Sequence, residues 1–215
     1  MFEFPPRGSV EALLLDMDGT IVDSHAAVER GWSQWAQEQG APAADVLAVC
    51  HGVAPGATIR RFRPDLDAAE VDRQVAEHLR RETVDLEGVV AAPGALRLIE
   101  AIAAAGIPWA VVTNASRELA TARMGAAGIH PPMLVGLDDV AAGKPAPDAY
   151  EEAARRLGVD VTRCIAVEDS ETGLASARAA GAAAFEIGPD AGSLDDLTDW
   201  IESSRSGTGT GIATP

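Results

Sequence analysis

Two aspartates two positions apart, Asp16 and Asp18, directly follow an apolar run and precede Gly19. In an extended backbone such side chains point the same way, so the two carboxylates can hold a divalent cation together. A carboxylate can also attack phosphorus and form an aspartyl phosphate, which makes Asp16 a candidate nucleophile. Asp18 would protonate the leaving alcohol and later deprotonate the hydrolytic water. A solvated turn explains Asp18-Gly19, a common turn pair, but not Asp16 directly after three leucines.

The apolar run from Val10 to Leu15 is the element that must position this pair. It is broken only by Glu11 and lacks polar alternation. Such a run predicts a strand covered on both faces, as in the centre of a parallel sheet. Open α/β sheets bind ligands at the carboxyl ends of their strands, and Asp16 would lie at such an end.

A second clear strand, Ile107 to Val112, ends in Thr113 and Asn114. Hydroxyl and amide groups at a helix start can bind a phosphate oxygen, together with backbone donors. An ordinary helix N-cap explains the same two residues. On this motif alone, the ordinary N-cap is the better explanation.

Lys144 lies between Gly143 and Pro145, shortly before a helix expected from about Asp148. Prolines at a helix start fix the approach of the chain, so Lys144 could point inward at a phosphate and at the nucleophile. A solvated surface lysine is the alternative, which the flanking prolines disfavour.

A further apolar strand, Cys164 to Val167, ends in Glu168 and Asp169. Carboxylates again terminate a buried strand here. Asp169 is the natural third contributor to a cation site made of hard oxygen ligands.

Strands and helices alternate along the chain, which predicts an α/β fold with a doubly wound, Rossmann-like parallel sheet and right-handed crossovers. In such a sheet the four polar motifs all emerge at one carboxyl edge, although they are far apart in the sequence. The remaining expected strands are 133–135 and 183–187, and the expected helices are 95–105, 116–127, 148–157 and 174–180.

No strand pattern appears between Ser24 and Leu86, where apolar residues recur at helical spacing. This segment predicts a small all-helical domain inserted after the first strand. We expect an α/β core over 1–22 and 92–203, the helical domain over 23–91, and a disordered tail rich in Ser, Gly and Thr over 204–215.

The composition, with 47% hydrophobic and 23% charged residues in a chain of 215, is that of a soluble globular protein. No apolar run reaches the roughly 20 residues that span a bilayer, and the N-terminus does not resemble a secretory signal, so we expect a cytoplasmic protein. The formal charge of −16 argues against nucleic acid and anionic membrane surfaces as partners. Cys50 and Cys164 are expected to be buried free thiols, and we expect a monomer.

The motifs Asp16-Met17-Asp18-Gly19-Thr20, Thr113-Asn114, Gly143-Lys144-Pro145 and Glu168-Asp169 resemble those of the haloacid dehalogenase superfamily of phosphatases and mutases, in the order typical of that family. The resemblance implies that Asp16 is the nucleophile and Asp18 the general acid/base. It implies that Thr113 and Lys144 bind the phosphate. Further substrate contacts are assigned to three residues of the same motifs, namely Gly19, Thr20 and Asn114.

The resemblance also implies a magnesium ion (Mg2+) held by Asp16, the backbone carbonyl of Asp18, and Asp169. Glu168 would lie behind these ligands or bind through water. The helical insertion resembles the small cap of the family, which closes over the site and excludes water.

The fourth motif continues as Ser170-Glu171-Thr172-Gly173 and lacks the further Asp that many members carry, so it resembles the branch of sugar-phosphate enzymes. The mutases of that branch carry a lysine before a cap-loop glycine and an arginine three residues after it, whereas this chain has His51-Gly52 and Pro55. We therefore prefer hydrolysis of a small phosphorylated sugar or polyol. A β-phosphoglucomutase-like transferase and a phosphoglycolate-type phosphatase remain alternatives.

Within the cap, His51, Gly52 and Arg60 are candidate substrate contacts. A buried structural histidine explains His51 equally well, and Arg60 belongs to an arginine-rich face that water can solvate. The other histidines are expected to be surface or packing residues.

A phosphoacceptor signalling module is the rival outside enzymes, because receiver domains also combine acidic residues, a Thr and a Lys on a doubly wound sheet. In receiver domains these groups follow a different order and there is no helical insertion. A silent scaffold has no reason to retain both Asp16 and Asp18.

Overall fold

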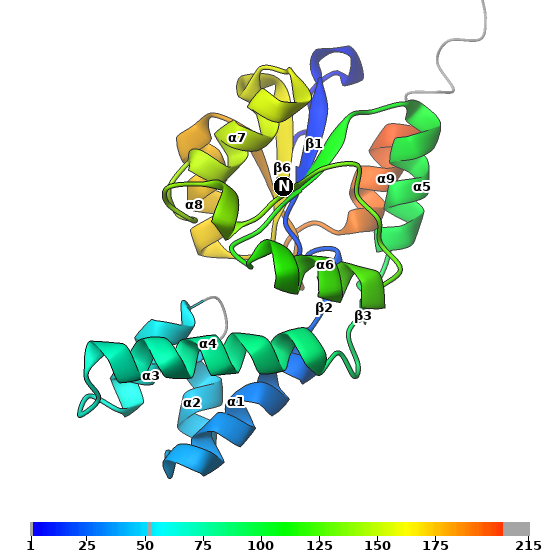
Figure 1. Cartoon of the computed structure of the whole chain (residues 1–215). Coiled ribbons are helices and arrows are strands. Elements are labelled where there is room, and N and C mark those ends of the chain that lie inside the picture. The colour runs from blue at the N-terminus through cyan, green and yellow to red at the C-terminus, as the bar shows by residue number, and fades with distance from the viewer. Residues whose placement is uncertain (1, 51–52, 204–215) are drawn as a thin grey trace, which may run out of the picture.

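The computed structural model describes residues 2–50 and 53–203. Its centre is a five-stranded parallel sheet in the order β5-β4-β1-β6-β7 (Figure 1). The predicted doubly wound parallel sheet is confirmed. The strands are β1 (Ala12–Leu15), β4 (Trp109–Val112), β5 (Leu134–Val135), β6 (Cys164–Glu168) and β7 (Ala183–Glu186).

Helices cover both faces of this sheet, because successive side chains of the buried strands point to opposite faces. Leu13 and Leu15 pack on the side of α5 (Ala95–Ala105) and α9 (Leu194–Ser203), whereas Leu14 packs on the side of α7 (Asp148–Leu157) and α8 (Glu171–Ala180) (Figure 1). The core helices are α5 (Ala95–Ala105), α6 (Arg117–Ala126), α7 (Asp148–Leu157), α8 (Glu171–Ala180) and α9 (Leu194–Ser203), with short 3-10 turns η1 (Arg7–Ser9), η2 (Leu137–Asp139) and η3 (Val161–Arg163).

Two short strands, β2 (Val22–Asp23) and β3 (Val90–Ala91), pair antiparallel and carry the chain out of the core and back. The four cap helices between them are α1 (His25–Gln39), α2 (Ala43–Cys50), α3 (Pro55–Phe62) and α4 (Ala68–Val84). Their own small core contains Trp32 and Trp35, whose rings meet edge to face at 5.4 Å. The boundaries that the sequence predicts for the inserted domain, residues 23 and 91, remain predictions.

Two helices differ from the expected elements. Helix α8 begins at Glu171 rather than 174, because the Ser170 hydroxyl accepts a hydrogen bond from the Gly173 amide and caps the first turn. Helix α9 is not among the expected elements, although Leu194, Leu197 and Ile201 recur at helical spacing and bury against the core.

The predicted substrate contacts His51 and Gly52, and the predicted disordered tail over 204–215, lie outside the described residues. Within the described ranges, none of the helices combines the length and the apolar character that a membrane crossing requires.

Replacing Leu14 by Ala tests the central strand. Leu14 is fully buried between β1 and the helices of one face, so the truncation leaves a cavity and should lower the free energy of unfolding by about 2–5 kcal/mol. Urea denaturation measures this change. The matched control is Leu96→Ala on α5, where the side chain is exposed and the expected change is within about 0.5 kcal/mol. Equal losses in the two variants would contradict the assigned packing.

Candidate active site

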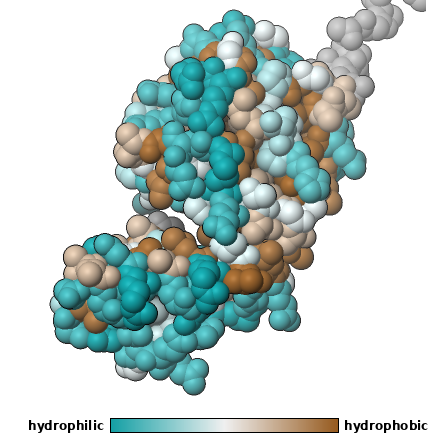
Figure 2. Space-filling view, viewed as in Figure 1, coloured by the Kyte–Doolittle hydropathy of each residue, from teal (hydrophilic) through white to brown (hydrophobic). Residues whose placement is uncertain are grey.

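The carboxyl edge of the sheet and the cap helices enclose a cleft of about 640 Å³. Figure 2 shows the molecule hollowed between its two lobes, with hydrophobic side chains on the cap surface that faces the core. The structure brings most of the predicted site residues into this cleft: Asp16, Asp18, Gly19, Thr113, Asn114, Lys144 and Asp169.

Lys144 is the only lysine of the chain and lies buried at the centre of the site. Its Nζ donates to Asp16 Oδ1 at 2.6 Å, to Glu168 Oε1 at 2.6 Å and to the Val112 carbonyl at 2.8 Å. An ammonium has three donors, so all are used. Burial lowers the pKa of Lys144, but the two carboxylates outweigh burial and raise it above its ordinary value. Lys144 therefore stays charged beside the candidate nucleophile.

The loop before α7 is fixed by Asn114. The Lys144 amide donates to Asn114 Oδ1 at 2.8 Å, and Asn114 Nδ2 donates back to the Lys144 carbonyl at 3.1 Å. The following Lys144-Pro145 bond is cis. A Cβ on Gly143 would collide with the Asn114 side chain, so glycine permits this close approach. Asn114 thereby positions Lys144.

Glu168 is fully buried at the end of β6. Its Oε1 accepts from Lys144 and from the Tyr150 hydroxyl at 2.6 Å, while Oε2 accepts from the Ser170 hydroxyl at 3.3 Å. Protein donors thus occupy both oxygens, and Glu168 orients Lys144. Tyr150 is a site residue that the sequence analysis does not name, because its position on the apolar face of α7 predicts only packing.

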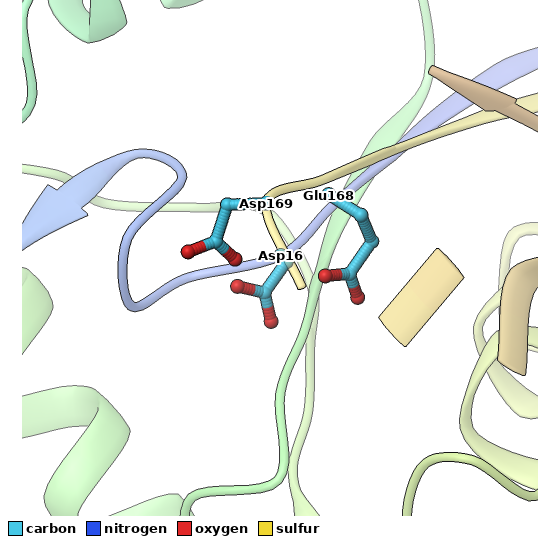
Figure 3. Close-up of side chains that lie close together, drawn as sticks. All are labelled: Asp16, Glu168 and Asp169. Carbon is cyan, nitrogen blue, oxygen red and sulfur yellow. The ribbon is translucent and has the colours of Figure 1, made fainter. Parts of the chain in front are cut away.

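Carboxylate oxygens of Asp16, Glu168 and Asp169 lie within 4.8 Å of one another (Figure 3). Burial and the neighbouring Glu168 raise the pKa of Asp16 well above its ordinary value, with Lys144 opposing this in part. The pKa of Asp169 is also raised, by burial and then by Glu168. The cluster thus holds more negative charge than Lys144 compensates.

The donor set of this cluster fits a hard divalent cation such as Mg2+, which prefers carboxylate and carbonyl oxygens. Asp169 faces the cleft rather than the core. Gly19, with a φ of 84°, passes so close to the Asp169 carboxylate that a Cβ would collide with it. Glycine at this position lets the loop after Asp18 approach the cluster.

Asp18 lies in different surroundings from Asp16. Its Oδ1 accepts from the Ser24 hydroxyl at 2.7 Å, and its Oδ2 accepts from Arg123 Nη1 at 2.9 Å. Ser24 is the N-cap residue of α1, but its side chain makes no capping hydrogen bond there. Arg123 was not expected at the site, although its spacing from Leu119 and Ala120 places it on the buried face of α6.

The structure places three further predicted contacts. Thr113 is buried and lines the cleft, and its hydroxyl accepts from the Ala115 amide at 3.0 Å. Thr20 is buried, and its hydroxyl has no hydrogen-bond partner among the described residues. Arg60 is exposed on α3 and is not among the described residues that line the cleft. Their roles as substrate contacts stay predictions.

A paired lysine and aspartate lie at the edge of a parallel sheet, beside a second aspartate and an acidic cluster and under a helical cap, an arrangement that suits phosphoryl transfer. The model of the haloacid dehalogenase-like hydrolase family matches residues 10–181. The chain belongs to this family, and the expected enzyme class, a phosphatase of this superfamily, is confirmed.

Individual relatives share most of the chain. Hexitol phosphatase A of Escherichia coli (strain K12) is 40% identical over 172 residues, which cover 80% of this chain and 80% of that protein. Glycerol-1-phosphate phosphohydrolase 2 of Saccharomyces cerevisiae is 29% identical over 184 residues, covering 80% and 72%. The structure of β-phosphoglucomutase from Clostridium difficile superposes with a TM-score of 0.77 over 92% of this chain and 97% of that chain, at 17% identity, which shows a common fold.

Replacing Asp169 by Asn tests the acidic cluster through stability. A carboxyl whose pKa is raised by folding destabilises the metal-free protein once the pH lies above that pKa, so Asp169→Asn should melt higher than the wild type at neutral pH without metal. Mg2+ at about 100 times its Kd should stabilise the wild type by about 2.7 kcal/mol and the variant much less. Thermal unfolding with and without Mg2+ measures both effects. Exposed Asp72→Asn is the control, and an equal Mg2+ response in all three proteins would exclude Asp169 as a ligand.

Proposed function

We propose that the protein is a Mg2+-dependent phosphatase of small sugar or polyol phosphates that works through an aspartyl phosphate on Asp16. The observation that carries this proposal is the separation of the two aspartates: Asp16 pairs with Lys144, whereas Asp18 pairs with Arg123 and Ser24. Two carboxylates in one cleft with different partners suit two different roles. The names of the hexitol and glycerol phosphate relatives support the substrate class.

In the first step, an Asp16 oxygen attacks phosphorus and the bond from phosphorus to the substrate oxygen breaks. Asp18 gives its proton to the departing alcohol. In the second step, Asp18 takes a proton from water while that water attacks phosphorus, which releases inorganic phosphate and regenerates the Asp16 carboxylate. Lys144 and Thr113 hold the phosphoryl oxygens. A bound Mg2+, held by Asp16, Asp169 and the Asp18 carbonyl, would supply positive charge against the dianion.

A panel assay of phosphate release tests this function. With Mg2+, the wild type should hydrolyse hexitol, hexose or glycerol phosphates, and Asp16→Asn should lower kcat at least about 10³-fold, since a nucleophile is lost. Removing Mg2+ with a chelator should abolish turnover, and Asp72→Asn should retain it. Activity on phosphoglycolate alone would contradict the substrate class, and transfer of phosphate between sugar hydroxyls without net release would favour a mutase.

Replacing Asp18 by Asn tests the two-step mechanism. With p-nitrophenyl phosphate, whose leaving group departs without an acid, Asp16 should still become phosphorylated in this variant. The missing base should then slow hydrolysis, so that phosphoenzyme accumulates. Rapid quench with radiolabelled substrate, followed by hydroxylamine treatment, measures the acyl phosphate. A release of nitrophenol without any hydroxylamine-labile phosphate on the protein would argue against Asp16 as the attacking group.

A further inference from the structure

Four buried nitrogen atoms in the wall of the cleft next to Asp18 have no hydrogen-bond partner within the described ranges. They are Nδ1 and Nε2 of His78 and Nε and Nη2 of Arg123, the last of which has only an ion-pair contact with Glu82. Both side chains line the cleft, with His78 2% exposed and Arg123 4% exposed. Leaving a buried polar group without a hydrogen bond is destabilising, so such groups require an explanation. A ligand that completes these hydrogen bonds supplies one.

The His78 ring is held in place by packing rather than by hydrogen bonds. Its centroid lies 4.0 Å from that of Trp32 in the cap. Its Nε2 lies 3.6 Å from Glu82 Oε1, one helical turn further along α4, which is beyond hydrogen-bond distance. The ring is therefore oriented by packing, while neither of its nitrogens makes a hydrogen bond within the described part of the chain.

Arg123 and Glu82 connect His78 to the acid/base. Arg123 Nη1 is bound to Asp18, and its Nη2 lies 3.2 Å from Glu82 Oε1. Glu82 is buried as well, and its pKa is lowered despite burial because His78 and Arg123 lie beside it, so it remains an acceptor. Asp18, Arg123, Glu82 and His78 thus form a row that runs from the core into the cap.

The chemistry of the proposed reaction places the leaving alcohol along this row. Asp16 and Lys144 mark the phosphate end of the cleft, and the ester oxygen must lie within reach of Asp18 to receive its proton. The rest of the alcohol then extends past Asp18. A hydroxyl group both donates and accepts, which matches donors on His78 and Arg123 beside an acceptor on Glu82. Apolar side chains that can contact its carbon chain line the same cleft: Val28, Trp32 and Leu79.

We infer that His78, Glu82 and Arg123 form a hydroxyl subsite that selects leaving alcohols carrying hydroxyl groups next to the ester carbon. This inference rests on the proposed phosphatase function and specifies its substrate. The subsite spans the two lobes, because Arg123 belongs to the core and the other two residues to the cap. It therefore binds substrate hydroxyls only when cap and core enclose the cleft.

The test compares His78→Phe, which keeps an aromatic ring beside Trp32 but removes both nitrogens, with His78→Gln, which restores a polar group. The control is His130→Phe, at an exposed position that does not line the cleft. The substrates are hexitol 6-phosphate and glycerol phosphate, ethyl phosphate as the matched ester without hydroxyls, and p-nitrophenyl phosphate. We expect His78→Phe to lower kcat/KM for the polyol phosphates about 10–100-fold and to change the other two less than about threefold.

His78→Gln should recover part of the preference for polyol phosphates, and the control should match the wild type. Equal losses on all substrates would show that His78 serves packing only and would overturn the subsite. Binding to Asp16→Asn, measured by calorimetry with Mg2+, separates the subsite from turnover. Hexitol phosphate should bind that variant more tightly than ethyl phosphate, and the difference should vanish when His78→Phe is added. No turnover of any ester would refute the phosphatase proposal, whereas equal affinities for the two esters would refute the subsite.

Discussion

The site depends on one buried ammonium among carboxylates. Burying an unpaired charge is costly, and Lys144 meets that cost by donating to Asp16, Glu168 and a strand carbonyl at once. Three clustered carboxylates, Asp16, Glu168 and Asp169, against one ammonium leave two negative charges. A divalent cation would cancel this excess. The arrangement thus explains why a protein of net charge −16 can accept a phosphate.

The fold makes this ammonium rigid before any ligand arrives. The Asn114 side chain accepts a hydrogen bond from the Lys144 amide and donates one to the Lys144 carbonyl. The Tyr150 hydroxyl donates to the Glu168 carboxylate, to which Lys144 also donates. Asp16 follows β1, Asn114 lies just beyond β4 and Glu168 ends β6, so the parallel pairing of these three strands brings the groups together. Such preorganisation would lower the cost of placing Asp16, the proposed nucleophile, during the reaction.

Much of this architecture is readable from sequence because it rests on local patterns. Apolar runs ending in Asp16, Thr113 and Asp169 identify strands and their rims without knowledge of distant contacts. Tyr150 and Arg123 cannot be identified as site residues in this way. Their spacing predicts a buried helix face, but not which residues that face contacts. Helix α9 packs against α5 and carries none of the polar motifs. Only its own apolar spacing could therefore have predicted it.

Arg123 forms ion pairs with one carboxylate of the core and one of the cap. It is anchored to Asp18 in the core, and its second nitrogen meets Glu82 on α4 of the cap. Because both carboxylates are held by one guanidinium, moving the cap away would leave a largely buried Glu82 without its cation and Arg123 with one partner. The free energy of cap closure is therefore tied to the geometry of Asp18. Closing the cap over a substrate would also hold Asp18 in place, which suits the proposed mechanism, in which water is excluded until an aspartyl phosphate has formed.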